Sequence, residues 1–164
     1  MNEPLLAPRE RLSTPPGGFA LFNLGFRPFY LCASAFSAYS VALWAAQYAG
    51  WLPSAYLRGP LWHGYEMLFG FTMAVIAGFL LTAVRAWTGQ PTPTGAPLMA
   101  LVALWVLGRV LVLTPLGTVA VVVNAAFPVA LAVAIGVPLV RSRNVRNYFF
   151  VGLLVLMSAL IVAL

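Results

Sequence analysis

The sequence predicts an all-α fold, a polytopic transmembrane helical bundle with about five spans. Of its 164 residues, 62% are hydrophobic and only 7% are charged, whereas soluble domains carry roughly 25% charged residues. Several apolar runs approach the roughly 20 residues that a helix needs to cross the hydrocarbon core, while a β-barrel would show short alternating segments. These two observations indicate an integral membrane protein whose immediate partner is the lipid bilayer.

Five segments are apolar enough to serve as spans, and turn-forming residues separate them. The predicted spans are residues 28–49, 61–84, 97–113, 118–140 and 148–164. Thr114-Pro115-Leu116-Gly117 is a tight turn, so the third and fourth spans should be antiparallel neighbours. Residues 1–27 carry charges of both signs and several turn-forming residues. They predict an extramembrane arm with an interfacial segment, ahead of a bundle over residues 28–164.

The distribution of arginine predicts the orientation of the chain. All nine basic residues are arginine and the net charge is +6; in a membrane protein this charge marks helix ends rather than a nucleic-acid partner. With the N-terminus inside, only Arg58 and Arg109 fall toward the outside. The others would face the cytoplasm: Arg9, Arg11, Arg27, Arg85, Arg141, Arg143 and Arg146. The positive-inside rule therefore favours a cytoplasmic N-terminus.

The last predicted span ends without a polar anchor, because residues 159–164 are wholly apolar. We therefore expect the chain to be a truncated, N-terminal portion of a larger membrane protein. A complete protein that ends flush with the membrane is the alternative.

The stretch from Trp62 to Gly70 contains the side chains that are best suited to bind a ligand or to exchange a proton. It holds the only histidine, His63, and the only acidic residue outside the first ten positions, Glu66. On a helix, residues three and four apart share a face, so His63 should lie beside Glu66 and Met67. Small residues continue this face at positions 70, 74 and 78, and such a stripe lets another helix approach closely.

Helix geometry predicts that several polar residues share one depth near the outer surface. At about 1.5 Å per residue, Glu66 lies roughly 7 Å below that surface, Arg109 about 6 Å and Asn124 roughly 9 Å. A charge inside the membrane costs about 2.5–3.5 kcal/mol on insertion scales. We therefore predict an ion pair between Glu66 and Arg109 that orients His63.

Each of these residues also has a structural interpretation. His63 is either an interfacial residue that reaches toward water or a ligand of a metal or haem, and Met67 is either a packing residue or a thioether ligand. Glu66, Arg109 and Asn124 could simply connect helices. The sequence contains no phosphate-binding glycine loop, CxxC or HExxH motif. One histidine and one cysteine also cannot supply a complete structural zinc site.

Five motifs in order resemble the NnrS family. They are Gly25–Leu31, Trp62–Phe71, Ala77–Val84 continuing to Trp87-Thr88-Gly89, Leu104–Arg109 and Arg146–Phe150. The resemblance covers most of the chain. It implies a bacterial inner-membrane protein that contains haem and copper and is associated with denitrification and with protection against nitric oxide. Proteins of this family have roughly twice this length or more, which agrees with the expected truncation.

The resemblance also implies candidate site residues. The family motif commonly reads His-x-His-Glu-Met, in which His63 matches the first histidine and Met67 the methionine. Tyr65 stands in place of the second histidine and could donate a hydrogen bond or serve as a phenolate ligand. The expected cofactor-binding residues are therefore His63, Tyr65 and Met67, with His63 as the metal ligand and Glu66, Arg109 and Asn124 as a supporting polar layer.

Two alternatives remain open beside a haem protein. The first is a proton-linked transporter or permease in which His63 and Glu66 form a gate. The second is a truncated bundle without activity. In the haem interpretation, ligands missing from this chain would come from the absent C-terminal half or from a partner chain.

Overall fold

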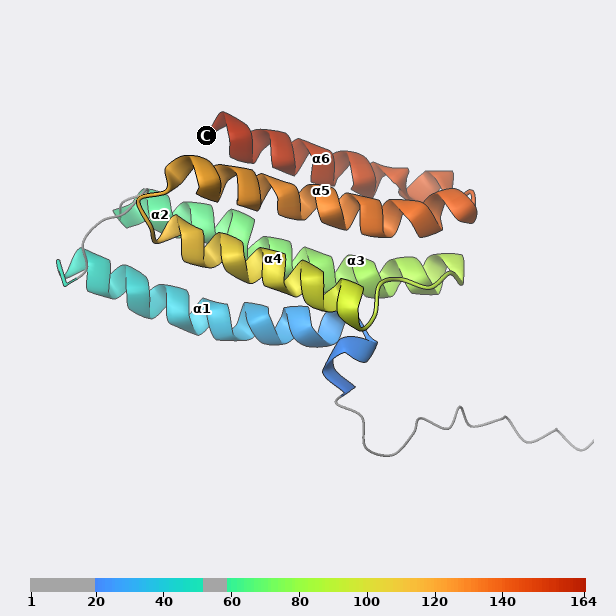
Figure 1. The fold of residues 1–164 in the computed structure, drawn as a ribbon, viewed down its shortest axis with the longest axis horizontal. Helices are drawn as coiled ribbons and strands as arrows, with labels where there is room; N and C mark the ends of the chain where they lie inside the picture. Colours follow the sequence, from blue (N-terminus) through green and yellow to red (C-terminus); the bar gives the residue numbers. More distant parts are fainter. Residues whose placement is uncertain (1–19, 52–58) are drawn as a thin grey trace, which may run out of the picture.

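The computed structural model describes residues 20–51 and 59–164, and these ranges contain helices and no strand (Figure 1). The predicted all-α fold class is therefore confirmed. The main helices are α1 (Phe26–Tyr48), α2 (Gly59–Tyr65), α3 (Met73–Thr88), α4 (Ala96–Val112), α5 (Gly117–Arg141) and α6 (Tyr148–Ala163). A π-helix, η2 (Glu66–Thr72), follows α2, and the short 3₁₀ helices η1 (Ala20–Asn23) and η3 (Val145–Asn147) precede α1 and α6. Most of the predicted N-terminal arm lies outside the described residues.

Four helical segments are long and apolar enough to cross a membrane. They are Phe26–Tyr48, Pro60–Thr88, Gly117–Arg141 and Val145–Ala163. The second is one continuous helix of 29 residues that includes α2, η2 and α3. It continues past the predicted end at Val84 to Thr88. The next residue, Gly89, ends the helix with a φ of 64°, which a glycine adopts without strain. Helix α4 has 17 residues, the lower limit for a span.

The helices lie side by side, and α3 packs against both α1 and α5 (Figure 1). The turn between α4 and α5 reverses the chain, so these two helices are antiparallel neighbours, as the sequence predicts. The main core lies among α1, α3, α4 and α5, where Phe29, Leu81, Leu98 and Leu131 are fully buried. In lipid this core is held by close packing rather than by exclusion of water.

The predicted stripe of small residues lies at the interface between α1 and α3. Ala74 is fully buried, and a Cβ atom on Gly78 would lie 2.8 Å from the ring of Tyr30. A methyl group at Gly78 would therefore separate the two helices. Small residues on the second span allow α1 to approach it closely.

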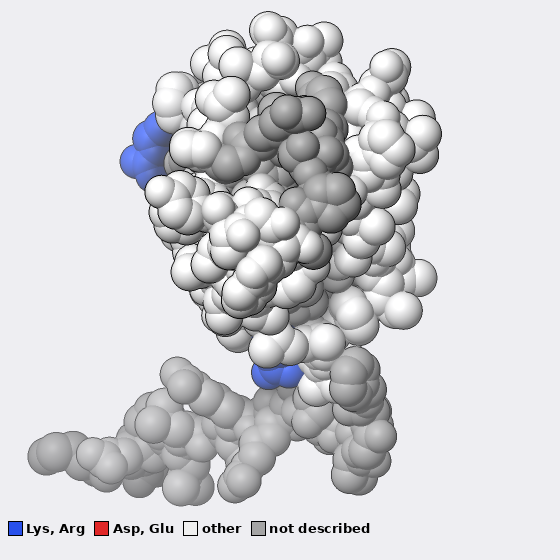
Figure 2. Space-filling model, turned by 90° about the vertical axis from the view of Figure 1, so that its left-hand side faces the viewer, with Lys and Arg blue, Asp and Glu red and all other residues white. Residues whose placement is uncertain are grey.

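The described arginines divide between the two ends of the bundle. Those at the start of α1, the end of α3 and the turn between α5 and α6 lie at one end: Arg27, Arg85, Arg141, Arg143 and Arg146. Arg109 lies toward the opposite end, which faces the viewer in Figure 2, where basic side chains appear only at the edges. This asymmetry agrees with the orientation expected from the positive-inside rule, which stays a prediction. Arg9, Arg11 and Arg58 lie outside the described residues.

Candidate functional site

A buried ion pair joins the second span to α4. Nη1 of Arg109 lies 2.6 Å from Oε2 of Glu66, and the two side chains are only 9% and 1% exposed. The predicted ion pair is therefore present. Because one partner alone would be an uncompensated charge inside the bundle, each residue makes the burial of the other tolerable.

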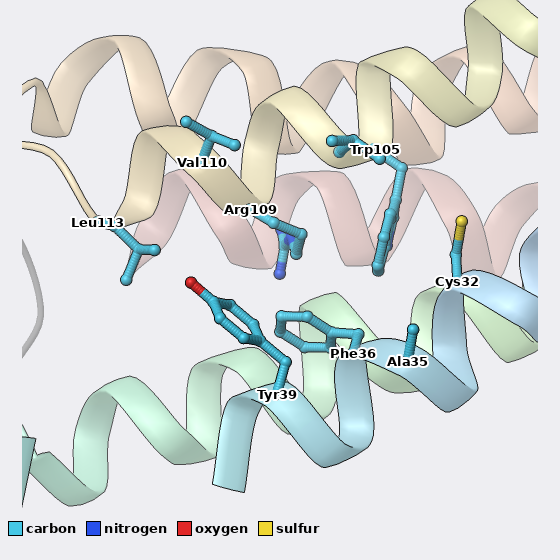
Figure 3. A pocket seen from close by; sticks show the side chains of 9 residues that line it. Cys32, Ala35, Phe36, Tyr39, Trp105, Arg109, Val110 and Leu113 are labelled. Atoms are coloured by element: carbon cyan, nitrogen blue, oxygen red, sulfur yellow. The ribbon is translucent and has the colours of Figure 1, made fainter. Parts of the chain in front are cut away.

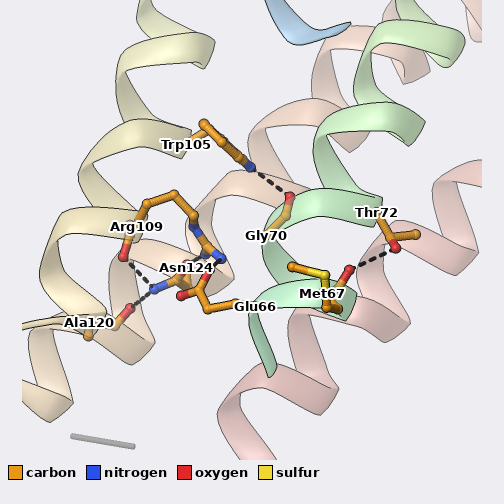
Figure 4. Close-up of polar contacts among 9 residues, drawn as sticks. Glu66, Met67, Gly70, Thr72, Trp105, Arg109, Ala120 and Asn124 are labelled. Carbon is orange, nitrogen blue, oxygen red and sulfur yellow. Dashed lines mark hydrogen bonds and ion pairs between the residues drawn. The ribbon is translucent and has the colours of Figure 1, made fainter. Parts of the chain in front are cut away.

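Asn124 of α5 extends this pair into a three-helix network (Figure 4). Nη2 of Arg109 donates to Oδ1 of Asn124. The amide nitrogen of Asn124 donates to the carbonyl oxygens of Ala120, at 2.8 Å, and of Gly108, at 3.3 Å. The structure thus brings together the three residues that the sequence analysis places at one depth, and they connect η2, α4 and α5.

Trp105 and Gly70 shape the space around the ion pair. Nε1 of Trp105 donates to the carbonyl oxygen of Gly70 at 3.0 Å, and the Trp105 ring centroid lies 5.8 Å from Cζ of Arg109. A Cβ on Gly70 would lie 2.5 Å from Nη1 of Arg109 and 2.6 Å from Oε2 of Glu66. A side chain at position 70 would therefore displace the ends of the two paired side chains.

Sequence reasoning did not assign Trp105 to the site. Trp105 precedes Arg109 by one helical turn, so the spacing places both side chains on one face of α4. Its edge-to-face contact with Phe36 of α1, at a centroid distance of 5.5 Å, depends on the tertiary packing and has no sequence signal.

The acidic residue begins a π-helix rather than a regular α-helix. Residues Glu66–Thr72 form this segment, in which Oγ1 of Thr72 donates to the carbonyl oxygen of Met67, five residues earlier, at 2.8 Å. A regular α-helix throughout the predicted span 61–84, which the spacing of three and four assumes, is therefore wrong for this part. Because π-helical bonds join residues five apart, the spacing of three and four does not describe the faces of this turn. Such segments occur frequently at functional sites.

His63 is oriented by α1 rather than by the ion pair. Its ring stacks on that of Trp44, with a centroid distance of 4.8 Å and an interplanar angle of 20°. Among the described residues, no hydrogen bond or ion pair joins His63 to Glu66. Nδ1 of His63 is buried and has no hydrogen-bond partner within the described part of the chain. The predicted direct orientation of His63 by the ion pair is therefore not seen.

Further buried polar atoms near His63 and the ion pair also lack partners. They are Nε1 of Trp44, Oε1 of Gln47, Nε1 of Trp62, Oε1 of Glu66 and Nε of Arg109. A buried polar atom without a hydrogen bond costs about 1–3 kcal/mol. Several hydrogen-bonding groups without partners among the described residues are therefore concentrated where α1 ends and along α2 and the start of η2.

Tyr65 and Met67 have surroundings different from those of His63. The Tyr65 ring lies 5.0 Å from that of Phe69, and Tyr65 lines a pocket of about 350 Å³ that Leu164 also lines. Met67 packs against the main core. The structure thus does not place the three candidate ligands around one pocket.

The described residues do not form a complete metal site. They contain no group of three or more His, Cys, Asp or Glu side chains that could hold a metal ion. His63 fits as a single ligand, because its half-buried imidazole has a ring nitrogen, Nδ1, that is not committed to another group in the described ranges.

A separate groove of about 300 Å³ lies between α1 and α4 beside the ion pair (Figure 3). Cys32, Phe36 and Tyr39 of α1 line it, together with Trp105 and Arg109 of α4. Its walls are predominantly apolar, so the part of Arg109 that lines this groove is surrounded by apolar side chains.

The family described as NnrS protein matches residues 20–164 of the chain. The chain belongs to the NnrS family. Comparisons with curated proteins and with solved structures found no match. The NnrS match includes the second span, with His63 and Glu66, and also the arginine and asparagine of the network. Together with its apolar helices, it makes the chain an NnrS-like, multi-pass membrane protein.

Proposed function

We propose that this chain acts in the nitric oxide response of a bacterial inner membrane and offers His63 as a protein ligand to haem or copper. The observation that carries the proposal is the buried ring nitrogen Nδ1 of His63, which has no partner in residues 20–51 and 59–164 and lies within the NnrS-matched part of the chain. Imidazole is a ligand of both haem iron and copper. A bound haem or copper ion would supply the binding of nitric oxide and the transfer of electrons.

Trp44 holds the imidazole ready for such a role. Stacking at 4.8 Å restricts rotation of the His63 ring, and a ligand whose orientation is set beforehand binds with a smaller loss of entropy. The remaining ligands would have to come from outside the described residues, for example from a partner chain, because these residues supply only one.

The Glu66–Arg109–Asn124 network acts as a positioning element in this proposal. It ties η2, which follows His63 directly, to α4 and α5. Truncating one member of a buried ion pair costs about 3–5 kcal/mol. The network therefore keeps the second span, and with it the backbone of His63, in one position relative to the bundle.

The test compares His63→Ala with Gly64→Ala in the purified full chain. Gly64 is the matched control, because a Cβ at this position meets no atom within 4 Å. We expect the wild type and Gly64→Ala to retain haem or copper, seen as a Soret band or as bound copper. His63→Ala should lose this signal at unchanged helix content. A wild-type chain purified without either group would overturn the proposal.

Growth under nitric oxide tests the physiological part. Cells without the gene should become sensitive, and the wild-type chain and Gly64→Ala should restore tolerance while His63→Ala should not. Equal tolerance with and without the chain would contradict a role in this response.

A proton-linked gate formed by His63 and Glu66 receives less support from the geometry. Such a gate needs proton exchange between the two side chains, yet Oε2 of Glu66 is held by Arg109 and no hydrogen bond joins Glu66 to His63 among the described residues. Flux in vesicles that depends on pH, in protein free of haem and copper, would favour the gate instead.

A further inference from the structure

The outer face of α5 and α6 carries a long apolar groove that the proposed function does not use. Its volume is about 540 Å³, and valines of both helices line it with Gly136 at its centre and Arg141 at one end. Several of these valines are strongly exposed, among them Val133 at 62% and Val155 at 53%. In a membrane, such side chains face lipid.

The dimensions of the groove match one leaflet of a bilayer. Along α5 it extends from Val129 to Arg141, which is about 18 Å at the helical rise of 1.5 Å per residue. Half of a hydrocarbon core of about 30 Å is about 15 Å. The apolar walls therefore run through the depth that an acyl chain occupies, and Arg141 lies where the headgroups begin.

The charge at the end of the groove is positive and uncompensated. The side chains of Arg141, Arg143 and Arg146 are exposed and make no hydrogen bond or ion pair among the described residues. All three lie at the turn between α5 and α6. The one acidic residue in the described ranges, Glu66, lies toward the other end of the bundle and pairs with Arg109.

We propose that this groove binds an anionic phospholipid, with one acyl chain against the valines of α5 and α6 and the phosphate at Arg141. Basic residues at helix ends attract anionic headgroups, and pockets between transmembrane helices that carry them bind such lipids. A zwitterionic lipid would bring a cationic amine toward the same arginines. The site therefore selects the lipid by the charge of its headgroup and retains it through contacts between the acyl chain and the valines.

A second copy of the chain is a poorer occupant of the groove. A symmetric dimer in a membrane has its two-fold axis along the membrane normal, so both copies present the same end to the same side. Packing through this face would bring the arginines of both α5–α6 turns together, and like charges at an interface oppose association.

The experiment measures lipid retention by native mass spectrometry of the purified full chain. The chain is incubated with equal amounts of phosphatidylglycerol and phosphatidylcholine that carry the same acyl chains. We expect preferential retention of phosphatidylglycerol by the wild type and by Arg141→Lys. Arg141→Gln should lower this preference about fivefold, because Arg141 is the basic residue that lines the groove and would contact the bound phosphate.

Two variants separate the groove from a general effect of charge. Arg85→Gln removes the same charge at the same end of the bundle but does not line the groove, so it is the matched control and should change the preference less than twofold. Gly136→Leu should fill the groove and reduce retention of phosphatidylglycerol. A Cβ at Gly136 is in ordinary van der Waals contact with Cγ2 of Val151, at 3.8 Å, and the rest of the leucine would extend into the groove; unchanged helix content and thermal stability check that the variant is folded.

Four results would overturn the proposal. These are equal effects of Arg141→Gln and Arg85→Gln, unchanged retention in Gly136→Leu, displacement of the lipid by inorganic phosphate alone, and a dimer that Gly136→Leu dissociates. The measurement does not depend on haem or copper, so its failure and that of the proposed function are distinguishable.

Discussion

The two ends of this bundle treat their charges in opposite ways. Toward one end, Arg109 is 92% buried and its guanidinium is committed to Glu66 and Asn124. At the other, Arg141, Arg143 and Arg146 are exposed and bear no ion pair within the described ranges. The difference teaches that arginine in a membrane protein either needs a partner inside the bundle or has to reach the headgroups, since an isolated charge in hydrocarbon is expensive.

The largest expected effect comes from breaking the buried pair. Glu66→Gln and Arg109→Gln should each lower the free energy of unfolding by about 3–5 kcal/mol, because each leaves the other group buried without its partner. Denaturant titration in mixed micelles measures this loss. The double variant should lose less than the sum of the single variants, and strict additivity would show that the two side chains do not interact.

A methyl group at position 70 should produce the next largest effect. Gly70→Ala places its Cβ 2.5 Å from Nη1 of Arg109 and 2.9 Å from Cε1 of Phe36, and overpacking of this kind costs about 1–3 kcal/mol. The same titration measures the change. Gly64→Ala, on the same long helix, is the control: its Cβ meets no atom within 4 Å, so it should be neutral or slightly stabilising. Equal losses in the two variants would mean that crowding at position 70 is not the cause.

Removing one hydrogen bond beside the pair should have a smaller effect. Trp105→Phe keeps an aromatic ring against Phe36 but removes the bond of 3.0 Å to the carbonyl oxygen of Gly70. We expect a loss of about 0.5–1.5 kcal/mol in the free energy of unfolding. Because the ring is retained, a loss as large as that of Arg109→Gln would show that Trp105 shapes the whole network.

The smallest effect on stability is expected at the exposed end. Arg143→Gln should change the free energy of unfolding by no more than about 0.5 kcal/mol, as for most surface substitutions.

Raising the salt concentration to about 1 M shortens the Debye length to about 3 Å and should weaken the preference for anionic lipid. The loss caused by Glu66→Gln should barely respond to the same salt, and a strong response would place that pair in contact with water.

Hydropathy and charge alone predicted a good part of the architecture. The low proportion of charged residues indicated a helical membrane protein, and the resemblance to the NnrS family followed from long ordered motifs. The ion pair was also predictable, because Glu66 and Arg109 have opposite charges at similar depth and neither is tolerated alone in hydrocarbon. The same estimate of depth placed Asn124 in the polar layer, whereas its hydrogen bond with Arg109 was found only in the structure.

The ring contacts and the π-helix could not be predicted in this way. Stacking of His63 on Trp44 joins residues on different helices, so no local spacing encodes it. The π-helix at Glu66–Thr72 changes which residues face α4, and nothing in the apolar pattern distinguishes it from an α-helix. Met67 lies within the π-helix and packs against the main core. Tyr65 precedes the π-helix, and two residues apart on a regular helix it would not share a face with His63 in any case.

By itself, the sequence determined that the chain is helical, that it crosses a membrane and which charges require partners, because the bilayer penalises every unpaired polar group in the same way wherever it occurs. Which side chains meet was decided only by the tertiary structure. Packing one residue more or less into a helical turn rotates every later side chain to another neighbour, so contacts such as that between Trp105 and Gly70 exist only once the helices have assembled.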